Sequence, residues 1–189
     1  MIKHIRTMQS DLQLREEQEE MIISGYFAIF NQKTELYKDV FEEIAPEAFN
    51  NSLDADVRAL INHETKAVLG RTKAGTLELK TDDKGLFGTI RINPKDTEAV
   101  NLYERVKRGD VNQCSFGFFI TDEEVEHKEG KSYWRINGVE LYEVSVCTFP
   151  AYENTGVEAR EKQEQETSLR RWKTLTKEKL NNAKNNNVE

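Results

Sequence analysis

The sequence is poor in several residue types on which whole classes of protein depend. Its 189 residues include two cysteines and three prolines, and they contain no apolar run of the roughly 18 residues that a membrane-spanning helix needs. The net charge of −7 argues against a nucleic-acid binder held by a basic surface. We therefore expect neither membrane nor nucleic acid as a partner. The start of the chain has no apolar signal segment, so we expect a cytoplasmic protein with reduced thiols.

Histidines are also scarce, which limits the chemistry that the chain can perform. The three histidines are far apart, and no two metal-ligand residues have the close spacing of a metal site. His4 lies in a polar segment and His127 lies among glutamates, whereas His63 follows an apolar run. We predict no metal and no cofactor, and His63 is the one histidine that is a candidate for catalysis. A structural, hydrogen-bonded His63 is an equally good interpretation of the sequence alone.

Apolar residues are concentrated in the middle of the chain, which divides it into three parts. Residues 1–20 are predicted to be a solvated, partly helical lead-in, and residues 157–189 a charged tail that is helical or disordered. Residues 21–156 alternate short apolar runs with turn signals. This pattern predicts an α+β domain that is mainly an antiparallel β-barrel of about eight strands with a few flanking helices.

Alternation and turn residues locate the elements of this domain. Asn93 is the expected cap of the main helix, and Asn137 with Gly138 is the expected turn between the last two strands. His63 is predicted to continue the strand face that carries Val57 and Ile61. Strands are predicted at residues 21–30, 40–44, 57–63, 75–81, 85–92, 111–121, 133–136 and 139–149, and helices at 45–49 and 93–109.

Ser115 is the candidate nucleophile within an aromatic, glycine-spaced strand. A serine hydroxyl attacks a carbonyl only when a base removes its proton, so this interpretation depends on His63. Gly117 would allow a substrate backbone to approach closely. The simpler interpretation of Ser115 is an ordinary strand serine. Cys114 is a rival nucleophile, although its side chain faces the opposite side of the strand and its neighbours would not lower a thiol pKa.

Glu143 lies within an apolar strand and is the candidate third member of a catalytic triad. A carboxylate in such a segment needs a partner, because burying an unpaired charge is costly. The catalytic interpretation pairs it with the second ring nitrogen of His63. Glu140 is the second choice, since it faces the other way and follows a turn. The structural interpretation pairs Glu143 with one of three arginines: Arg71, Arg91 or Arg135.

Taken together, four motifs resemble the prohead proteases of tailed phages. They are Asn62-His63 followed by Leu69-Gly70-Arg71, then Ser115-Phe116-Gly117-Phe118, Leu141 to Val146, and Phe149-Pro150-Ala151. The resemblance extends from about Gly25 to Ala159. It implies a fold like that of the herpesvirus assembly proteases and a serine endopeptidase in which His63 is the base, Ser115 the nucleophile and Glu143 the third member. It assigns no oxyanion donors in this chain.

The resemblance also implies a biological role. Such enzymes act in the host cytoplasm, inside the immature capsid, on the scaffolding protein or on the scaffold segment of the major capsid protein, and many cleave themselves. The herpesvirus enzymes act as dimers, and a homodimer is left open for this chain. Two alternatives also remain open: a non-catalytic assembly or scaffold-binding protein on the same fold, and a cysteine hydrolase that uses Cys114 or Cys147.

Overall fold

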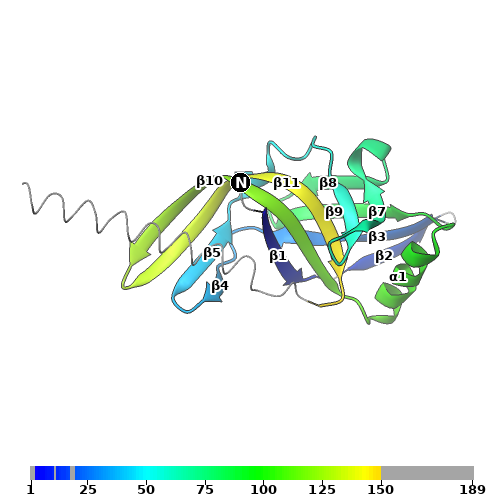
Figure 1. The fold of residues 1–189 in the computed structure, drawn as a ribbon, viewed down its shortest axis with the longest axis horizontal. Helices are drawn as coiled ribbons and strands as arrows, with labels where there is room; N and C mark the ends of the chain where they lie inside the picture. The colour runs from blue at the N-terminus through cyan, green and yellow to red at the C-terminus, as the bar shows by residue number, and fades with distance from the viewer. Residues whose placement is uncertain (1–2, 11, 18–19, 150–189) are drawn as a thin grey trace, which may run out of the picture. The chain divides into compact units, whose positions relative to one another are not determined.

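The structure is a computed structural model that describes residues 3–10, 12–17 and 20–149, and the predicted tail at 157–189 lies outside them (Figure 1). Eleven strands, one α-helix and two short 3-10 helices make up the described residues. The elements are β1 Lys3–Gln9, β2 Gln13–Glu17, β3 Glu20–Ile29, β4 Thr34–Tyr37, β5 Val40–Ile44, η1 Pro46–Phe49, β6 Arg58–Ile61, β7 Glu64–Arg71, η2 Thr72–Ala74, β8 Leu77–Thr81, β9 Gly85–Ile92, α1 Thr97–Arg108, β10 Gln113–Lys128 and β11 Lys131–Cys147.

The described residues are mostly strands with one α-helix, so the predicted α+β class is confirmed. The strands form two sheets, and the predicted β-barrel is corrected in that it is not closed. One sheet has the order β1-β10-β11-β5-β4, with β6 also paired to β11 and β7 paired to β6. The other has the order β2-β3-β9-β8. Within the described part of the chain, β1 and β4 end the first order and β2 and β8 end the second, so neither sheet closes on itself.

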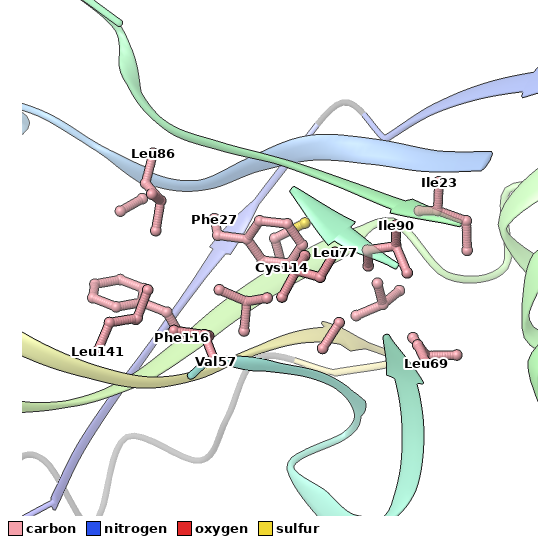
Figure 2. Packing of buried hydrophobic residues seen from close by; sticks show 14 of the residues in the cluster. Ile23, Phe27, Val57, Leu69, Leu77, Leu86, Ile90, Cys114, Phe116 and Leu141 are labelled. Atoms are coloured by element: carbon pink, nitrogen blue, oxygen red, sulfur yellow. The ribbon is translucent and has the colours of Figure 1, made fainter. Parts of the chain in front are cut away.

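A single apolar core joins the two sheets and the helix (Figure 2). Phe27 and Ile90 from the smaller sheet and Phe116 from the larger sheet are almost completely buried in it. The buried face of α1, formed by Ala99, Leu102, Tyr103 and Val106, belongs to the same cluster. Burying apolar side chains of this size contributes about 1.5–3 kcal/mol each, so this core supplies much of the stability that fixes β10 and β11 in place.

The long hairpin of β10 and β11 is the central feature of the larger sheet, and it differs from the prediction. Glu129 and Gly130, both with positive φ, form its turn. Asn137 and Gly138 lie within β11 rather than in a turn, and Gly138 faces Asp122 where the register shifts. The two strands predicted around Asn137 are therefore one. The local Asn-Gly signal is overridden by pairing along the whole length of β10.

The lead-in predicted to be partly helical is also extended. Residues of β1 pair antiparallel with β10, and residues of β2 pair antiparallel with β3. The polar composition of this segment did not indicate a strand of the domain. Arg6 of β1 is accommodated there because it pairs with the buried Glu42, which lies 36 residues away in the sequence. The main helix also begins later than expected. Its cap is Asp96, whose side chain accepts hydrogen bonds from the backbone N–H groups of Glu98 and Ala99.

Candidate active site

Adjacent strands carry two of the three predicted site residues on one face of the larger sheet. In the antiparallel pairing of β10 with β11, Ser115 lies opposite Ser145 and Gly117 lies opposite Glu143. Residues directly opposite each other in such a pair have their side chains on the same side. Phe116 and Val144 point to the other side, into the core. Ser115, Glu143 and Ser145 therefore share the face that points away from the core.

A register shift gives Glu143 this orientation. Phe118 pairs with Leu141 while Gly117 pairs with Glu143, so Tyr142 is the extra residue of a β-bulge. Leu141 consequently joins the core cluster although it is two residues from Glu143. Simple alternation would place both side chains on one face, and the extra residue prevents this. The bulge allows an apolar strand to present a carboxylate on the face opposite its leucine.

His63 lies in a two-residue turn rather than at the end of a strand. Ile61 pairs with Glu64, which leaves Asn62 and His63 as the two central residues of the β6–β7 hairpin. Both have positive φ, 48° and 64°, as the central residues of a type I′ turn do. Histidine at such a position is uncommon and costs free energy relative to glycine. The turn lifts His63 away from the strand and over the neighbouring β11.

The imidazole of His63 contacts Glu143 directly. Its Nδ1 lies 2.8 Å from Oε1 of Glu143, and the backbone N–H of His63 donates to Oγ of Ser145 at 3.2 Å. Ser145 in turn donates its hydroxyl to Oε2 of Glu143 at 2.6 Å. Both carboxylate oxygens are thus engaged, so burial leaves neither oxygen without a hydrogen-bond partner. Only 1% of the Glu143 side chain is exposed, against 16% for His63.

The arginines that were alternative partners of Glu143 are engaged elsewhere. Arg71 forms a two-pronged pair with Asp56, with Nε–Oδ1 and Nη2–Oδ2 distances of 2.7 and 2.6 Å. Arg135 donates to Glu43 at 2.6 Å, and Arg91 donates to a backbone carbonyl. Among the described residues, Lys3 is the lysine that forms an ion pair with Glu143, with its Nζ 4.0 Å from Oε1.

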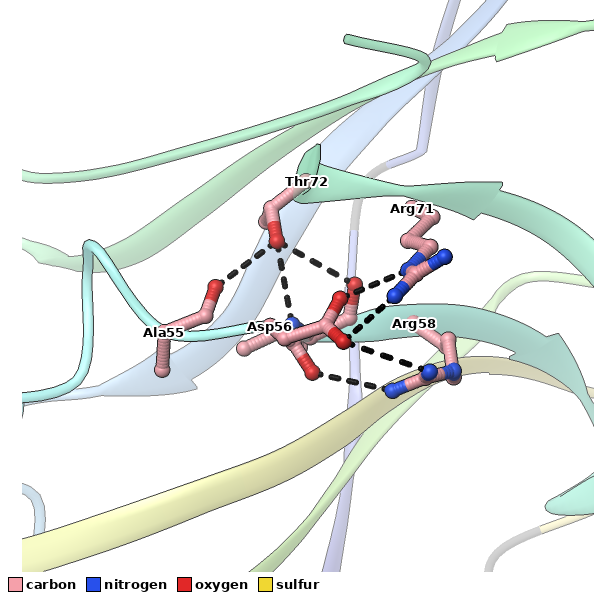
Figure 3. Close-up of polar contacts among 6 residues, drawn as sticks. Ala55, Asp56, Arg58, Arg71 and Thr72 are labelled. Atoms are coloured by element: carbon pink, nitrogen blue, oxygen red, sulfur yellow. Dashed lines mark hydrogen bonds and ion pairs between the residues drawn. The ribbon is translucent and has the colours of Figure 1, made fainter. Parts of the chain in front are cut away.

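Asp56 and its neighbours hold the base of the hairpin that carries His63 (Figure 3). Asp56 accepts from Arg71 at the end of β7 and, at 3.3 Å, from Arg58 at the start of β6. Thr72 donates its hydroxyl to the carbonyl of Ala55 and accepts from the backbone of Val57. The hydrogen bonds from Arg71 lower the pKa of Asp56 to about 2. This network ties together the two strands whose other ends meet at the turn of His63.

Within the described residues, the side chain of Ser115 forms hydrogen bonds with β1 and none with His63. Its hydroxyl donates to the backbone carbonyl of Arg6 at 2.9 Å and accepts from Oγ1 of Thr7 at 3.0 Å. The residue is completely buried. The structure thus brings His63 and Glu143 into contact and places Ser115 on the same face of the next strand, but it does not join Ser115 to His63 through a described hydrogen bond.

Cys147 occupies the free side of the His63 ring. Its Sγ lies 3.7 Å from Nε2 of His63. Burial and the nearby charge of Glu143 raise the pKa of the Cys147 thiol to about 12, and burial raises that of Cys114 to about 12 as well. Both sulfurs are therefore protonated at neutral pH. A protonated thiol is a poor nucleophile, which weighs against the cysteine alternatives despite the position of Cys147.

Gly117 fits its position because Glu143 occupies the space that a side chain would need. A Cβ atom on Gly117 would clash with Oε1 of Glu143 and would lie 2.9 Å from Cε of Lys3. This close approach is made by the carboxylate of the protein itself, whereas the sequence suggested a substrate backbone. The absence of a side chain at Gly117 lets Glu143 lie flat against β10, within reach of His63.

Within the described residues, the remaining candidates form no hydrogen bond or ion pair with His63, Ser115 or Glu143. Glu140 is exposed on β11, and His127 near the tip of the β10–β11 hairpin contacts Ser132 at 3.0 Å. His4 stacks on Phe118. No cluster of potential metal ligands occurs among residues 3–10, 12–17 and 20–149, and no helix within the described residues is long and apolar enough to cross a membrane.

Sequence reasoning gave no role to three residues around the site: Ser145, Lys3 and Thr7. Alternation from Glu143 places Ser145 on the same face, so its contact with Glu143 could have been predicted. Lys3 and Thr7 could not, since nothing local to the first ten residues indicates that they pair with β10. Their contact with the site depends on a strand register between segments more than 100 residues apart.

A histidine oriented by a buried carboxylate, on the same face of a sheet as a strand serine, is the arrangement expected of a serine hydrolase. The chain belongs to the caudovirus prohead serine protease family, which it matches over residues 8–170. It is 29% identical to the prohead protease of Enterobacteria phage HK97 over 163 residues, which span 84% of this chain and 68% of that protein.

A solved structure with a similar fold is the capsid assembly protease of bacteriophage T4. The two share 10% sequence identity with a TM-score of 0.50, and the match covers 79% of this chain and 98% of the T4 chain. At this identity the similarity concerns the fold alone. The family match confirms the resemblance that the four motifs indicated.

Proposed function

We propose that this protein is a prohead maturation serine endopeptidase in which Ser115 is the nucleophile, His63 the general base and Glu143 the residue that orients His63. The contact between Nδ1 of His63 and the buried carboxylate of Glu143 carries the proposal. A carboxylate in that position fixes the ring tautomer and stabilises the imidazolium ion that forms during catalysis. The family match supports the serine as nucleophile.

The mechanism follows from this geometry. With Nδ1–H donated to Glu143, Nε2 of His63 is the ring nitrogen that can accept a proton. As Oγ of Ser115 bonds to the substrate carbonyl carbon, Nε2 takes the hydroxyl proton. It then gives that proton to the amide nitrogen as the C–N bond breaks, which releases the amine. Water attacks the acyl ester, again with His63 as base, and Ser115 recovers its proton.

The family match also supports a proposal for the substrates and the setting. We propose that the enzyme cleaves the scaffolding protein, or the scaffold segment of the major capsid protein, inside the immature capsid in the host cytoplasm, and that it also cleaves itself. We further propose that the charged tail at residues 157–189 binds scaffold. A herpesvirus-protease-like core at 21–156 remains a prediction, and a homodimer remains open.

The test is to co-express the protein with the major capsid protein and the scaffolding protein of the same phage. The intact masses of all fragments then show whether and where those proteins are cleaved. Ser115→Ala and His63→Ala should each abolish cleavage, a loss of up to about a million-fold in rate for residues that act as a unit. Glu143→Gln should retain more activity, with a loss of about ten-thousand-fold. Cys114→Ala is the matched control, because it changes the adjacent residue on the opposite face.

One observation favours a second candidate, the cysteine hydrolase. Cys147, rather than Ser115, lies beside Nε2 of His63 in this structure. That mechanism predicts that Cys147→Ala abolishes cleavage and that Ser115→Ala does not, whereas a serine enzyme predicts the reverse. If none of these substitutions changes the fragments, a host protease makes the cuts. That result would support the alternative of a non-catalytic assembly protein.

A further inference from the structure

The first described strand covers the proposed nucleophile. β1 lies at the edge of the larger sheet and pairs with β10 from Lys3 opposite Phe119 to Gln9 opposite Gln113 (Figure 1). Thr7 lies directly opposite Ser115. β10 therefore has β11 on one side and β1 on the other, and an incoming peptide could pair with β10 beside Ser115 only in the place that β1 now occupies.

The contacts of β1 engage both functions of the serine hydroxyl. The Ser115 proton is donated to the Arg6 carbonyl, and the Ser115 oxygen accepts the proton of Thr7. A serine becomes a nucleophile when its proton points to a base and its lone pair points to a carbonyl carbon. Here the proton points to a peptide oxygen that is too weak a base to remove it, and Thr7 engages one of the two lone pairs of the serine oxygen. This arrangement is a resting state of the hydroxyl.

β1 also alters the charge next to the base. Nζ of Lys3 lies 4.0 Å from Oε1 of Glu143, the same oxygen that contacts His63, and 4.4 Å from the centre of the Tyr142 ring. A cation beside this carboxylate opposes the formation of a second cation on the imidazole. Detachment of β1 would remove Lys3 from Glu143 and leave the carboxylate to stabilise imidazolium.

An ionic anchor, more than apolar burial, holds β1 in place. The Arg6 guanidinium forms a two-pronged pair with Glu42 of β5, with Nε–Oε1 and Nη2–Oε2 distances of 2.5 and 2.7 Å. Most other side chains of the strand are only half-buried. A strand held this way at a sheet edge can be exchanged for another extended segment, because its backbone hydrogen bonds are generic.

We propose that β1 is a built-in blocking strand that occupies the substrate edge of β10 and holds Ser115 away from His63. Catalysis requires β1 to leave β10, and an extended segment of the substrate polypeptide then pairs with the vacated edge. This inference rests on the proposed serine endopeptidase, and it adds a conformational step that precedes the chemistry.

A reversible cross-link between β1 and β10 tests the proposal. Lys3→Cys with Phe119→Cys places two cysteines at directly opposed positions, where Cα atoms are about 4.5–5.5 Å apart and a disulfide can form. Glu78→Cys with Thr89→Cys is the matched control, joining β8 to β9 in the other sheet. The measurement is the rate at which a biotinylated fluorophosphonate labels Ser115 in the full chain, before and after reduction, with the disulfide mapped by peptide mass.

The oxidised Lys3→Cys/Phe119→Cys variant should label at least about tenfold more slowly than its reduced form, since only molecules with β1 detached are competent. The control should label at the same rate in both forms. Equal rates for the oxidised and reduced β1 variant would overturn the blocking strand while leaving the serine enzyme intact. A reduced variant slower than the unsubstituted chain would overturn it too, because loss of Lys3 ought to loosen β1.

A second variant avoids any cross-link. Thr7→Val keeps a β-branched side chain and removes the hydroxyl that binds Ser115. It should label faster by about fivefold, the value of one hydrogen bond near 1 kcal/mol. An unchanged or slower rate contradicts the proposal. If Ser115 is not labelled in any form of the protein and no substrate is cleaved, the proposed function itself fails, and that result differs from every outcome above.

Discussion

At the residue scale, the site depends on a histidine held in a backbone conformation that favours glycine. His63 has φ of 64° at the second central position of its turn, where a side chain is disfavoured relative to glycine. The strain is maintained by what the residue contacts: the carboxylate of Glu143 and, through its backbone N–H, Ser145. Strain of this kind concentrates at functional sites, where geometry matters more than stability.

Two substitutions at this position separate strain from chemistry. His63→Ala and His63→Gly both remove the imidazole and leave the same gap beside Glu143. The glycine variant should nevertheless have a free energy of unfolding about 1 kcal/mol higher than the alanine variant, because only alanine is penalised at positive φ. Urea denaturation of the two proteins measures the difference. Equal stabilities would show that the turn imposes no strain on His63.

Gly117 is a second position where the site depends on a single residue, because a Cβ atom there would clash with the carboxylate of Glu143. Gly117→Ala would drive a methyl group into Oε1 of Glu143 and displace the carboxylate from His63. We expect a folded protein, since alanine is tolerated at least as well as glycine in a strand. Activity on co-expressed capsid and scaffold proteins should fall at least about a hundredfold, as for a modest displacement of a positioning group. Cleavage at the normal rate would mean that Glu143 does not need this space.

At the scale of elements, the site is assembled where a bulge in β11 meets the turn of the β6–β7 hairpin. Alternation along β11 predicts that Leu141 and Glu143 share a face, and the extra residue Tyr142 separates them. The sequence contains no local signal for this bulge, since it arises from the register between β10 and β11. The far end of the hairpin is fixed by Asp56, Arg58 and Arg71, which no alternation pattern reveals as partners (Figure 3).

The Asp56 network gives the hairpin a predictable dependence on acid. Asp56 has a folded pKa of about 2, below its ordinary 3.8, so its pairing stabilises the fold above pH 4 and is lost as the pH falls toward 2. Asp56→Asn should therefore lower the thermal midpoint at pH 5–7, and its difference from the unsubstituted chain should shrink between about pH 4 and pH 2. Asp54→Asn, an exposed aspartate in the same loop, is the control. A difference independent of pH would contradict the account.

At the scale of the whole molecule, many strands and the helix of the β-rich domain could be predicted from the sequence. The arrangement of the strands in two open sheets could not. The runs at Val40–Ile44 and Gly85–Ile92 are strands as alternation and β-branched residues indicate, and the helix over Thr97–Arg108 follows from its apolar stripe. Whether strands form one barrel or two sheets depends on which distant edges meet. That is set by register and by long-range pairs such as Arg6 with Glu42, which leave no local pattern.

The same distinction applies to the candidate site. His63, Ser115 and Glu143 could be singled out because each is a polar residue in or beside an apolar run, and the family motifs gave them roles. The structure brings two of them into contact and adds the strand that covers the third. That covering strand belongs to a polar segment whose composition indicated no part in the domain.

The central claim is that Ser115 is the residue activated by the His63–Glu143 pair. The most direct measurement is the site of attachment of a fluorophosphonate, located by peptide mass in the unsubstituted chain and in His63→Ala. The account predicts a single adduct on Ser115 that disappears in the His63→Ala protein. An adduct on another serine, such as Ser145, or an adduct on Ser115 that forms equally well without His63, would contradict it.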